Sequence, residues 1–263
     1  MQLEYKNYGE TGPPVIILHG LLGSSKNWHT AARKLAEECR VTVPSLRNHG
    51  GSPHGRHGLD EMVGDVLHWL DQQDVSRVFL LGHSMGGMVA MALACRYPER
   101  LQGLVVVDIS PVNHLNPMLP TFAALESVSL ERIKRREDAD NQLAQAISSP
   151  FVRQFLLQNL KRTEEGTYVW QCNLPELSRF VREEKQFFLQ PSDRFTGATL
   201  FIGGGRSEHR LEDQHTAIQR HFPQSTLVMI PEAGHWVHFE ALQPFLDATF
   251  AFIHKVQSAP GEP

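Results

Sequence analysis

Short runs of apolar residues, each the length of a β-strand, recur along the chain and constrain its fold more than any other feature. The runs are continuous rather than alternating, which is typical of parallel strands covered on both faces. Helical patterns separate them, the clearest being an apolar stripe at steps of three and one from Leu59 to Leu70. This alternation predicts a mostly parallel, doubly wound α/β sheet. Five runs lie at 15–18, 78–81, 104–107, 199–202 and 227–230, and a shorter sixth lies at 41–43.

The alternation stops near Ser110 and resumes near Gly197. Between these points the sequence is rich in charged residues and helix formers, with helical segments expected at 130–147 and 151–162, and prolines break it into pieces. We therefore predict a helical cap inserted at 111–196. The α/β core then comprises 1–110 and 197–257, and 258–263 is expected to be a flexible tail.

Composition narrows the possible partners and the compartment. The 263 residues carry a formal net charge of −4, which does not favour nucleic acid as a partner. Cys39, Cys95 and Cys172 are too widely spaced for a C-x-x-C pair, and their odd number argues against a disulfide-linked secreted scaffold. Residues 1–10 are polar and charged, so we do not expect a signal peptide there, and no apolar run reaches the ~18 residues of a membrane span. A cytoplasmic protein without a membrane span is expected.

The strongest functional signal is G-x-S-x-G at 82–86, which follows the apolar run at 78–81 and opens the helical pattern at 88–96. This strand–turn–helix context is typical of a nucleophile elbow, and Ser84 is the predicted nucleophile. Glycines are needed because a sharp turn leaves no room for flanking side chains. The helix that follows places backbone N–H groups where negative charge develops in the reaction.

A histidine–glycine pair directly follows the first buried strand, in the segment that begins with His19. A loop of this kind can fold back over the elbow. The N–H of Leu21 is then expected to complete an oxyanion hole with the N–H of Met85.

His235 lies in a loop directly after the last apolar run and is the predicted general base. A serine hydroxyl must lose a proton to attack, and an imidazole with a pKa near neutrality suits that task. The order Ser84 then His235 also matches the elbow architecture. Among rival histidines, His83 is expected to point away from the elbow, and His49 and His238 lack the position after the last strand.

These motifs resemble those of the α/β-hydrolase superfamily, and within it the small serine esterases and thioesterases. The resemblance rests on H-G-L-x-G-S-x-x-N-W at 19–28, R-N-H-G-x-S at 47–52 and G-H-S-M-G-G at 82–87, with a similar cap stretch at 168–174. It implies an α/β-hydrolase fold. One departure is Ser45, where relatives usually have an aspartate two residues before the R-N-H-G run.

The acid of the triad is the least determined residue. The resemblance places it after the penultimate strand, where this chain has Ser207, and serine cannot stabilise an imidazolium ion electrostatically. Glu208 is adjacent to that position. Asp108 ends the run at 104–107, a second location from which some hydrolases of this fold supply the acid. We favour Asp108, with Glu208 and Ser207 as the alternatives.

Neither a metal nor an organic cofactor is predicted. The pairs His54 with His57 and His235 with His238 lack a third ligand nearby in the sequence. No glycine-rich loop has the spacing of a nucleotide-binding motif.

The sequence thus predicts a serine hydrolase that cleaves carboxylic esters or thioesters through an acyl-enzyme, acting on a small-molecule substrate as a monomer or homodimer. Two alternatives stay open: a carbon–carbon bond hydrolase or lyase on the same fold, and a ligand-binding receptor with weak turnover. Apolar cap residues, among them Phe122 and Trp170, are candidates for an acyl pocket, although at helical spacing they more often pack the cap.

Overall fold

A seven-stranded sheet forms the centre of the computed structural model, which describes residues 1–112, 118–183 and 189–259. Its strands run in the order β1-β3-β2-β4-β5-β8-β9. The first strand pairs antiparallel with β3, and all the other pairs are parallel. The strands are β1 Tyr5–Tyr8, β2 Pro14–Leu18, β3 Arg40–Pro44, β4 Val78–His83, β5 Leu101–Val107, β8 Thr199–Gly204 and β9 Ser225–Ile230.

All six predicted strands are confirmed, each extended by one to three residues in total. The strand β1 was not predicted. Three of its four residues are exposed, so it has no apolar run to reveal it. It forms through its backbone pairing with β3 at the edge of the sheet.

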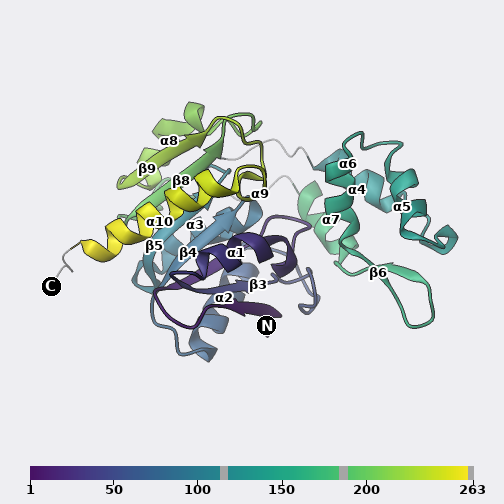
Figure 1. Ribbon diagram of the computed structural model, residues 1–263, viewed down its shortest axis with the longest axis horizontal. Coiled ribbons are helices and arrows are strands. Elements are labelled where there is room, and N and C mark those ends of the chain that lie inside the picture. The colour runs from purple at the N-terminus through teal and green to yellow at the C-terminus, as the bar shows by residue number, and fades with distance from the viewer. Residues whose placement is uncertain (113–117, 184–188, 260–263) are drawn as a thin grey trace.

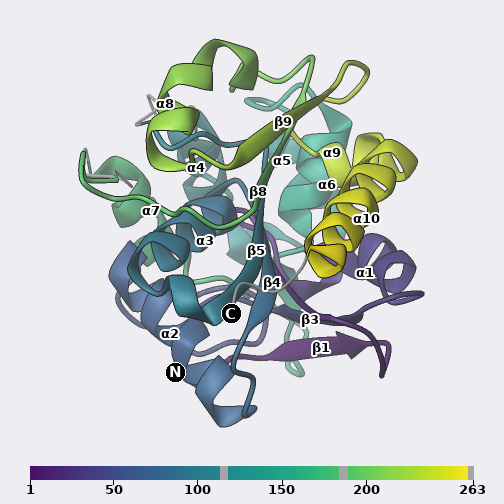
Figure 2. The same ribbon diagram turned by 90° about the vertical axis from the view of Figure 1, so that its left-hand side faces the viewer.

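Helices cover both faces of the sheet (Figure 2). The predicted stripe becomes α2 Leu59–Gln72, which packs with α3 Met85–Arg96 against one face. On the opposite face lie α1 His29–Leu35 and α10 Leu242–Ser258. The remaining helices of the core are α8 His215–His221, α9 Val237–Glu240, η1 Ser25–Trp28, η2 Pro98–Arg100 and η4 Leu211–Gln214.

The described residues between α4 and α7, 119–182, form a separate layer, mostly of helices, at one side of the sheet (Figure 1). It has its own apolar cluster, in which Phe122, Leu157 and Leu177 are fully buried. The boundaries of the cap stay predictions. Its elements are α4 Leu119–Glu126, η3 Leu130–Arg132, α5 Arg136–Leu143, α6 Pro150–Leu157, β6 Leu160–Arg162, β7 Tyr168–Trp170 and α7 Leu174–Arg182.

Two local expectations need correction. The segment 130–147 is not one helix but a 3-10 turn followed by α5, and residues Leu160–Arg162 form a strand paired with β7 rather than the end of a helix. At the C-terminus, Ser258 is the last residue of α10. Most of the predicted tail, 260–263, lies outside the described residues.

The parallel strands all end at one edge of the sheet, where doubly wound folds bind their ligands. Hydrogen bonds fix the cap layer to loops at this edge: the Asn159 amide donates to the Leu22 carbonyl at 2.8 Å, and the His57 N–H donates to Glu176 at 2.7 Å. Among the described residues, no helix is long and apolar enough to cross a membrane.

Candidate active site

Ser84 occupies a strained turn between β4 and α3. Its φ of 51° and ψ of −121° lie outside the regions favoured by residues with a side chain. The turn is tight: a Cβ atom at Gly82 would lie 2.2 Å from the Gly86 carbonyl oxygen, and one at Gly86 would lie 2.3 Å from the carbonyl oxygen of Leu18. The two glycines therefore allow the strand and helix to approach closely enough to project Ser84 from the elbow.

Asp108 follows β5 and is completely buried. Its φ of 52° is positive, a conformation that aspartate tolerates better than most residues. Three donors surround the carboxylate: the Gly204 N–H at 2.9 Å from Oδ1, and the Ser207 hydroxyl at 2.5 Å and His235 Nδ1 at 2.7 Å from Oδ2. These hydrogen bonds satisfy both oxygens of the buried carboxylate.

The structure separates the three candidates for the acid. Asp108 makes the hydrogen bond to His235, whereas Ser207 donates to Asp108 and Glu208 is exposed. Ser207 therefore occupies the position at which the resemblance placed the acid. Its hydroxyl supports the carboxylate of Asp108, which follows β5.

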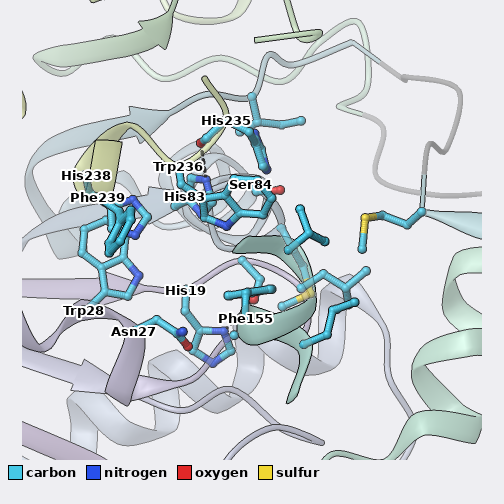
Figure 3. Close-up of a pocket in the computed structure, with 18 of the residues that line it drawn as sticks. His19, Asn27, Trp28, His83, Ser84, Phe155, His235, Trp236, His238 and Phe239 are labelled. Atoms are coloured by element: carbon cyan, nitrogen blue, oxygen red, sulfur yellow. Dashed lines mark hydrogen bonds between the residues drawn. The ribbon is translucent and has the colours of Figure 1, made fainter. Parts of the chain in front are cut away.

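His235 follows β9, and its side chain is partly exposed. Figure 3 shows it beside Ser84, and both residues line one cavity. Because Nδ1 faces Asp108, Nε2 is the ring nitrogen left to act on Ser84. Ser84, His235 and Asp108, which lie far apart in the sequence, are thus brought to one place.

The rival histidines have other partners. His83 does not point away from the site as expected, because its ring centroid lies 4.6 Å from that of His235. Its Nε2 donates to the His235 carbonyl at 2.9 Å, and burial lowers the pKa of His83 well below 6.5. His238 stacks on Trp28 at 3.8 Å, and burial lowers its pKa to about 3. Neither ring is hydrogen-bonded to a carboxylate among the described residues, so neither resembles an activated base.

The expected oxyanion donors flank Ser84. Met85 is the first residue of α3, so its N–H has no acceptor within that helix. Leu21 lies in the loop after β2 and lines the same cavity as Ser84. The geometry is compatible with the predicted pair of N–H donors, whose role stays a prediction.

Two buried histidines hold the Leu21 loop, a role that the sequence analysis missed. His49 accepts a hydrogen bond from the Leu22 N–H at 3.1 Å and donates to the Arg47 carbonyl at 2.9 Å. His19 accepts from the Leu46 N–H and donates to the Gly20 carbonyl. Burial lowers the pKa of both histidines to about 3, so both rings are neutral at physiological pH. The sequence signal for this role was the presence of His19 and His49 in the motifs at 19–28 and 47–52.

A glutamate supports the loop in which the resemblance places an aspartate. The Ser45 hydroxyl, at that position, donates to Glu4 at 3.1 Å, and the Gly51 N–H donates to the same carboxylate oxygen at 2.8 Å. A carboxylate from the N-terminal segment thus reaches the loop that contains Ser45.

The cavity at Ser84 has a volume of about 1100 Å³ and lies between the core and the cap layer. The suggestion that Phe122 and Trp170 line it is wrong: Phe122 is fully buried in the cap cluster, Trp170 packs against that cluster, and neither belongs to the cavity wall. The tryptophan and phenylalanine residues that do line it are Trp28, Phe151, Phe155, Phe180, Trp236 and Phe239.

Comparison with known proteins identifies the family. The sequence profile of the α/β hydrolase fold matches residues 13–242. The chain is 36% identical over 252 residues to the sn-1-specific diacylglycerol lipase ABHD11 of Mus musculus, covering 92% of this chain and 81% of that protein. It is 32% identical over 247 residues to the esterase YbfF of Escherichia coli, covering 92% and 93% of the two chains.

A solved structure described as a marine microorganism esterase superimposes with a TM-score of 0.91 at 32% identity. The match covers 95% of this chain and 99% of that one. The similarity therefore extends through the core and the cap layer.

Proposed function

This chain belongs to the α/β-hydrolase fold family, and we propose that it is a serine-dependent hydrolase of carboxylic esters and thioesters. The observation that carries the proposal is the 2.7 Å hydrogen bond between Asp108 and His235 beside the elbow serine. A buried carboxylate, an imidazole and a projecting hydroxyl are the groups that acyl transfer to serine requires.

In the proposed reaction, His235 Nε2 takes the hydroxyl proton as Ser84 Oγ attacks the acyl carbonyl. Asp108 stabilises the imidazolium that forms, and the N–H groups of Leu21 and Met85 bind the oxyanion. The C–O or C–S bond then breaks as His235 gives the proton to the departing alcohol or thiol. Water attacks the acyl-enzyme by the same steps in reverse order, so the cycle needs no external cofactor.

The cavity supports a substrate with an apolar acyl group. Met88, Ile109 and Met118 line it together with the aromatic residues of the wall, whereas Lys26 and Arg206 contribute positive charge. The names of the relatives, a diacylglycerol lipase and two esterases, also support an ester substrate. The unpaired state of all three cysteines is compatible with the cytoplasm as its compartment.

Hydrolysis of p-nitrophenyl esters and acyl thioesters of rising chain length tests the proposal. We expect turnover by the wild type and a loss of ~10³-fold or more in the variant Ser84→Ala, because no other group in the site can form the acyl-enzyme. Turnover retained by Ser84→Ala would exclude the serine mechanism. The ratio of ester to thioester rates identifies the preferred leaving group.

A further inference from the structure

A second histidine with metal-binding chemistry lies beside the Asp108–His235 pair. The ring centroids of His209 and His235 are 4.8 Å apart. Potential ligand atoms of Asp108, His209 and His235 all lie within 4.8 Å of one another. The three residues come from separate parts of the chain, because Asp108 follows β5, His209 follows β8 and His235 follows β9. We propose that these three side chains form a Zn²⁺ site and that the bound ion inhibits the enzyme.

The ligand set suits zinc. Two imidazoles and one carboxylate are protein ligands of the kind that hold Zn²⁺ in open sites, with a fourth position left for water. Metal–ligand bonds of about 2.0–2.2 Å place tetrahedral ligand atoms about 3.3–3.6 Å apart. Asp108 Oδ2 and His235 Nδ1, now 2.7 Å apart, need to separate slightly, while His209 needs to move closer.

His209 reaches the pair from a surface loop. It is partly exposed and lies between β8 and η4, whereas Asp108 lies in the core, where Gly204 and Ser207 donate to its carboxylate. The buried carboxylate of Asp108 supplies a negative charge that favours a cation. An ion can enter from the side of His209, which is partly exposed.

Inhibition follows from the atom of His235 to which the ion would bind. Nδ1 is the nitrogen of His235 that faces Asp108, so Zn²⁺ binds the Nδ1 lone pair of the neutral imidazole, and the single ring proton moves from Nδ1 to Nε2. With Nε2 protonated, the ring cannot accept the proton of Ser84. The inhibition rests on the proposed function, whereas binding of the ion does not.

The cysteines compete poorly for the ion. The pKa of Cys39 is raised to about 11, and the pKa values of Cys95 and Cys172 are raised to about 12, chiefly by burial. The thiols are therefore protonated at neutral pH, whereas zinc binds the thiolate. Exposed histidines elsewhere, such as His68 on α2, are the relevant competitors and supply a control.

Binding is tested with Zn²⁺ in calorimetric titrations of Ser84→Ala, which carries the site without turnover. We expect one ion per chain at this site, a loss of at least ten-fold in its affinity when His209→Phe is added, and no change when His68→Phe is added. Equal affinity with and without His209→Phe would overturn the site.

Inhibition is tested by ester hydrolysis in the otherwise unchanged enzyme, with each variant compared with itself in the presence and absence of Zn²⁺. The wild type and His68→Phe should lose activity at the same Zn²⁺ concentration and regain it on addition of a chelator. His209→Phe should require at least ten-fold more Zn²⁺. An active enzyme that binds the ion at His209 yet keeps its rate would overturn the inhibition. Absence of any hydrolysis together with His209-dependent binding would contradict the proposed function and leave the metal site standing.

Discussion

At the scale of single residues, the carboxylate of Asp108 is the group on which the proposed triad depends. The sequence left three positions open for the acid because two strand ends, distant in sequence, converge only in the folded sheet. In the structure the carboxylate of Asp108 contacts His235, whereas Glu208 is exposed. The residue type and its position after β5 made Asp108 predictable as a candidate. The supporting hydrogen bond from Ser207 was not predictable, because serine at an acid position signals only a missing charge.

Replacing Asp108 with asparagine should lower kcat by up to ~10⁴-fold, because the neutral amide neither stabilises the imidazolium nor fixes the required tautomer. Stopped-flow or steady-state hydrolysis of a p-nitrophenyl ester measures the effect. Glu208→Gln is the matched control and should cost little. A wild-type rate for Asp108→Asn together with an inactive Glu208→Gln would transfer the acid to the loop after β8.

Removing the hydroxyl of Ser207 should weaken the support of Asp108. The substitution Ser207→Ala deletes a 2.5 Å hydrogen bond to a fully buried carboxylate, and hydrogen bonds to charged groups contribute about 1.5–3 kcal/mol. Urea unfolding at pH 7 should show a decrease of that size in the free energy of unfolding. Unchanged stability would mean that water replaces the hydroxyl.

At the scale of secondary-structure elements, the elbow between β4 and α3 depends on close backbone packing. A Cβ at Gly86 would lie 2.3 Å from the carbonyl oxygen of Leu18 in β2, so Gly86→Ala should displace the start of α3. We expect a loss of at least ~10²-fold in kcat/KM, since small misplacements of catalytic groups have effects of this size.

Gly64→Ala in α2 is the control. Gly64 has no atom within 4 Å of the added Cβ, and this variant should gain about 0.5–1 kcal/mol of stability. An equal effect of Gly86→Ala and Gly64→Ala on kcat/KM would contradict this expectation.

The elements that the sequence predicted well are those whose burial leaves a continuous apolar run. The six parallel strands and the stripe of α2 belong to this group. The strand β1 and the pair β6–β7 were missed because they are short and largely polar, so that tertiary hydrogen bonding rather than local pattern determines them. Leu160–Arg162 looked helical because lysine and arginine favour helices, yet the segment pairs with β7.

At the scale of the whole molecule, buried neutral histidines tie stability to pH. Burial is the largest cause that lowers the pKa values of His19, His49, His57 and His238 from 6.5 to about 3. Unfolding exposes these rings, which then bind protons below pH 6.5. Their contribution to stability is therefore complete above pH 6.5 and is lost as the pH falls from 6.5 towards 3.

Urea unfolding at pH 7 and pH 5 should show this loss, with a decrease of about 2 kcal/mol per buried histidine. The substitution His238→Phe keeps an aromatic ring against Trp28. It should remove the contribution of one histidine from the difference in the free energy of unfolding between pH 7 and pH 5. His68→Phe, at an exposed position, should leave the difference unchanged. An identical pH dependence in the wild type and His238→Phe would contradict this account.

The central claim is that His235 activates Ser84. Labelling by a fluorophosphonate at neutral pH tests it most directly, because this reagent reports an activated serine rather than the mere presence of one. The wild type and His238→Phe should each gain one adduct, located on Ser84 by peptide mass spectrometry, whereas His235→Ala should react at least ~10³-fold more slowly. Labelling of His235→Ala at the wild-type rate, or loss of labelling in His238→Phe instead, would show that another histidine is the base.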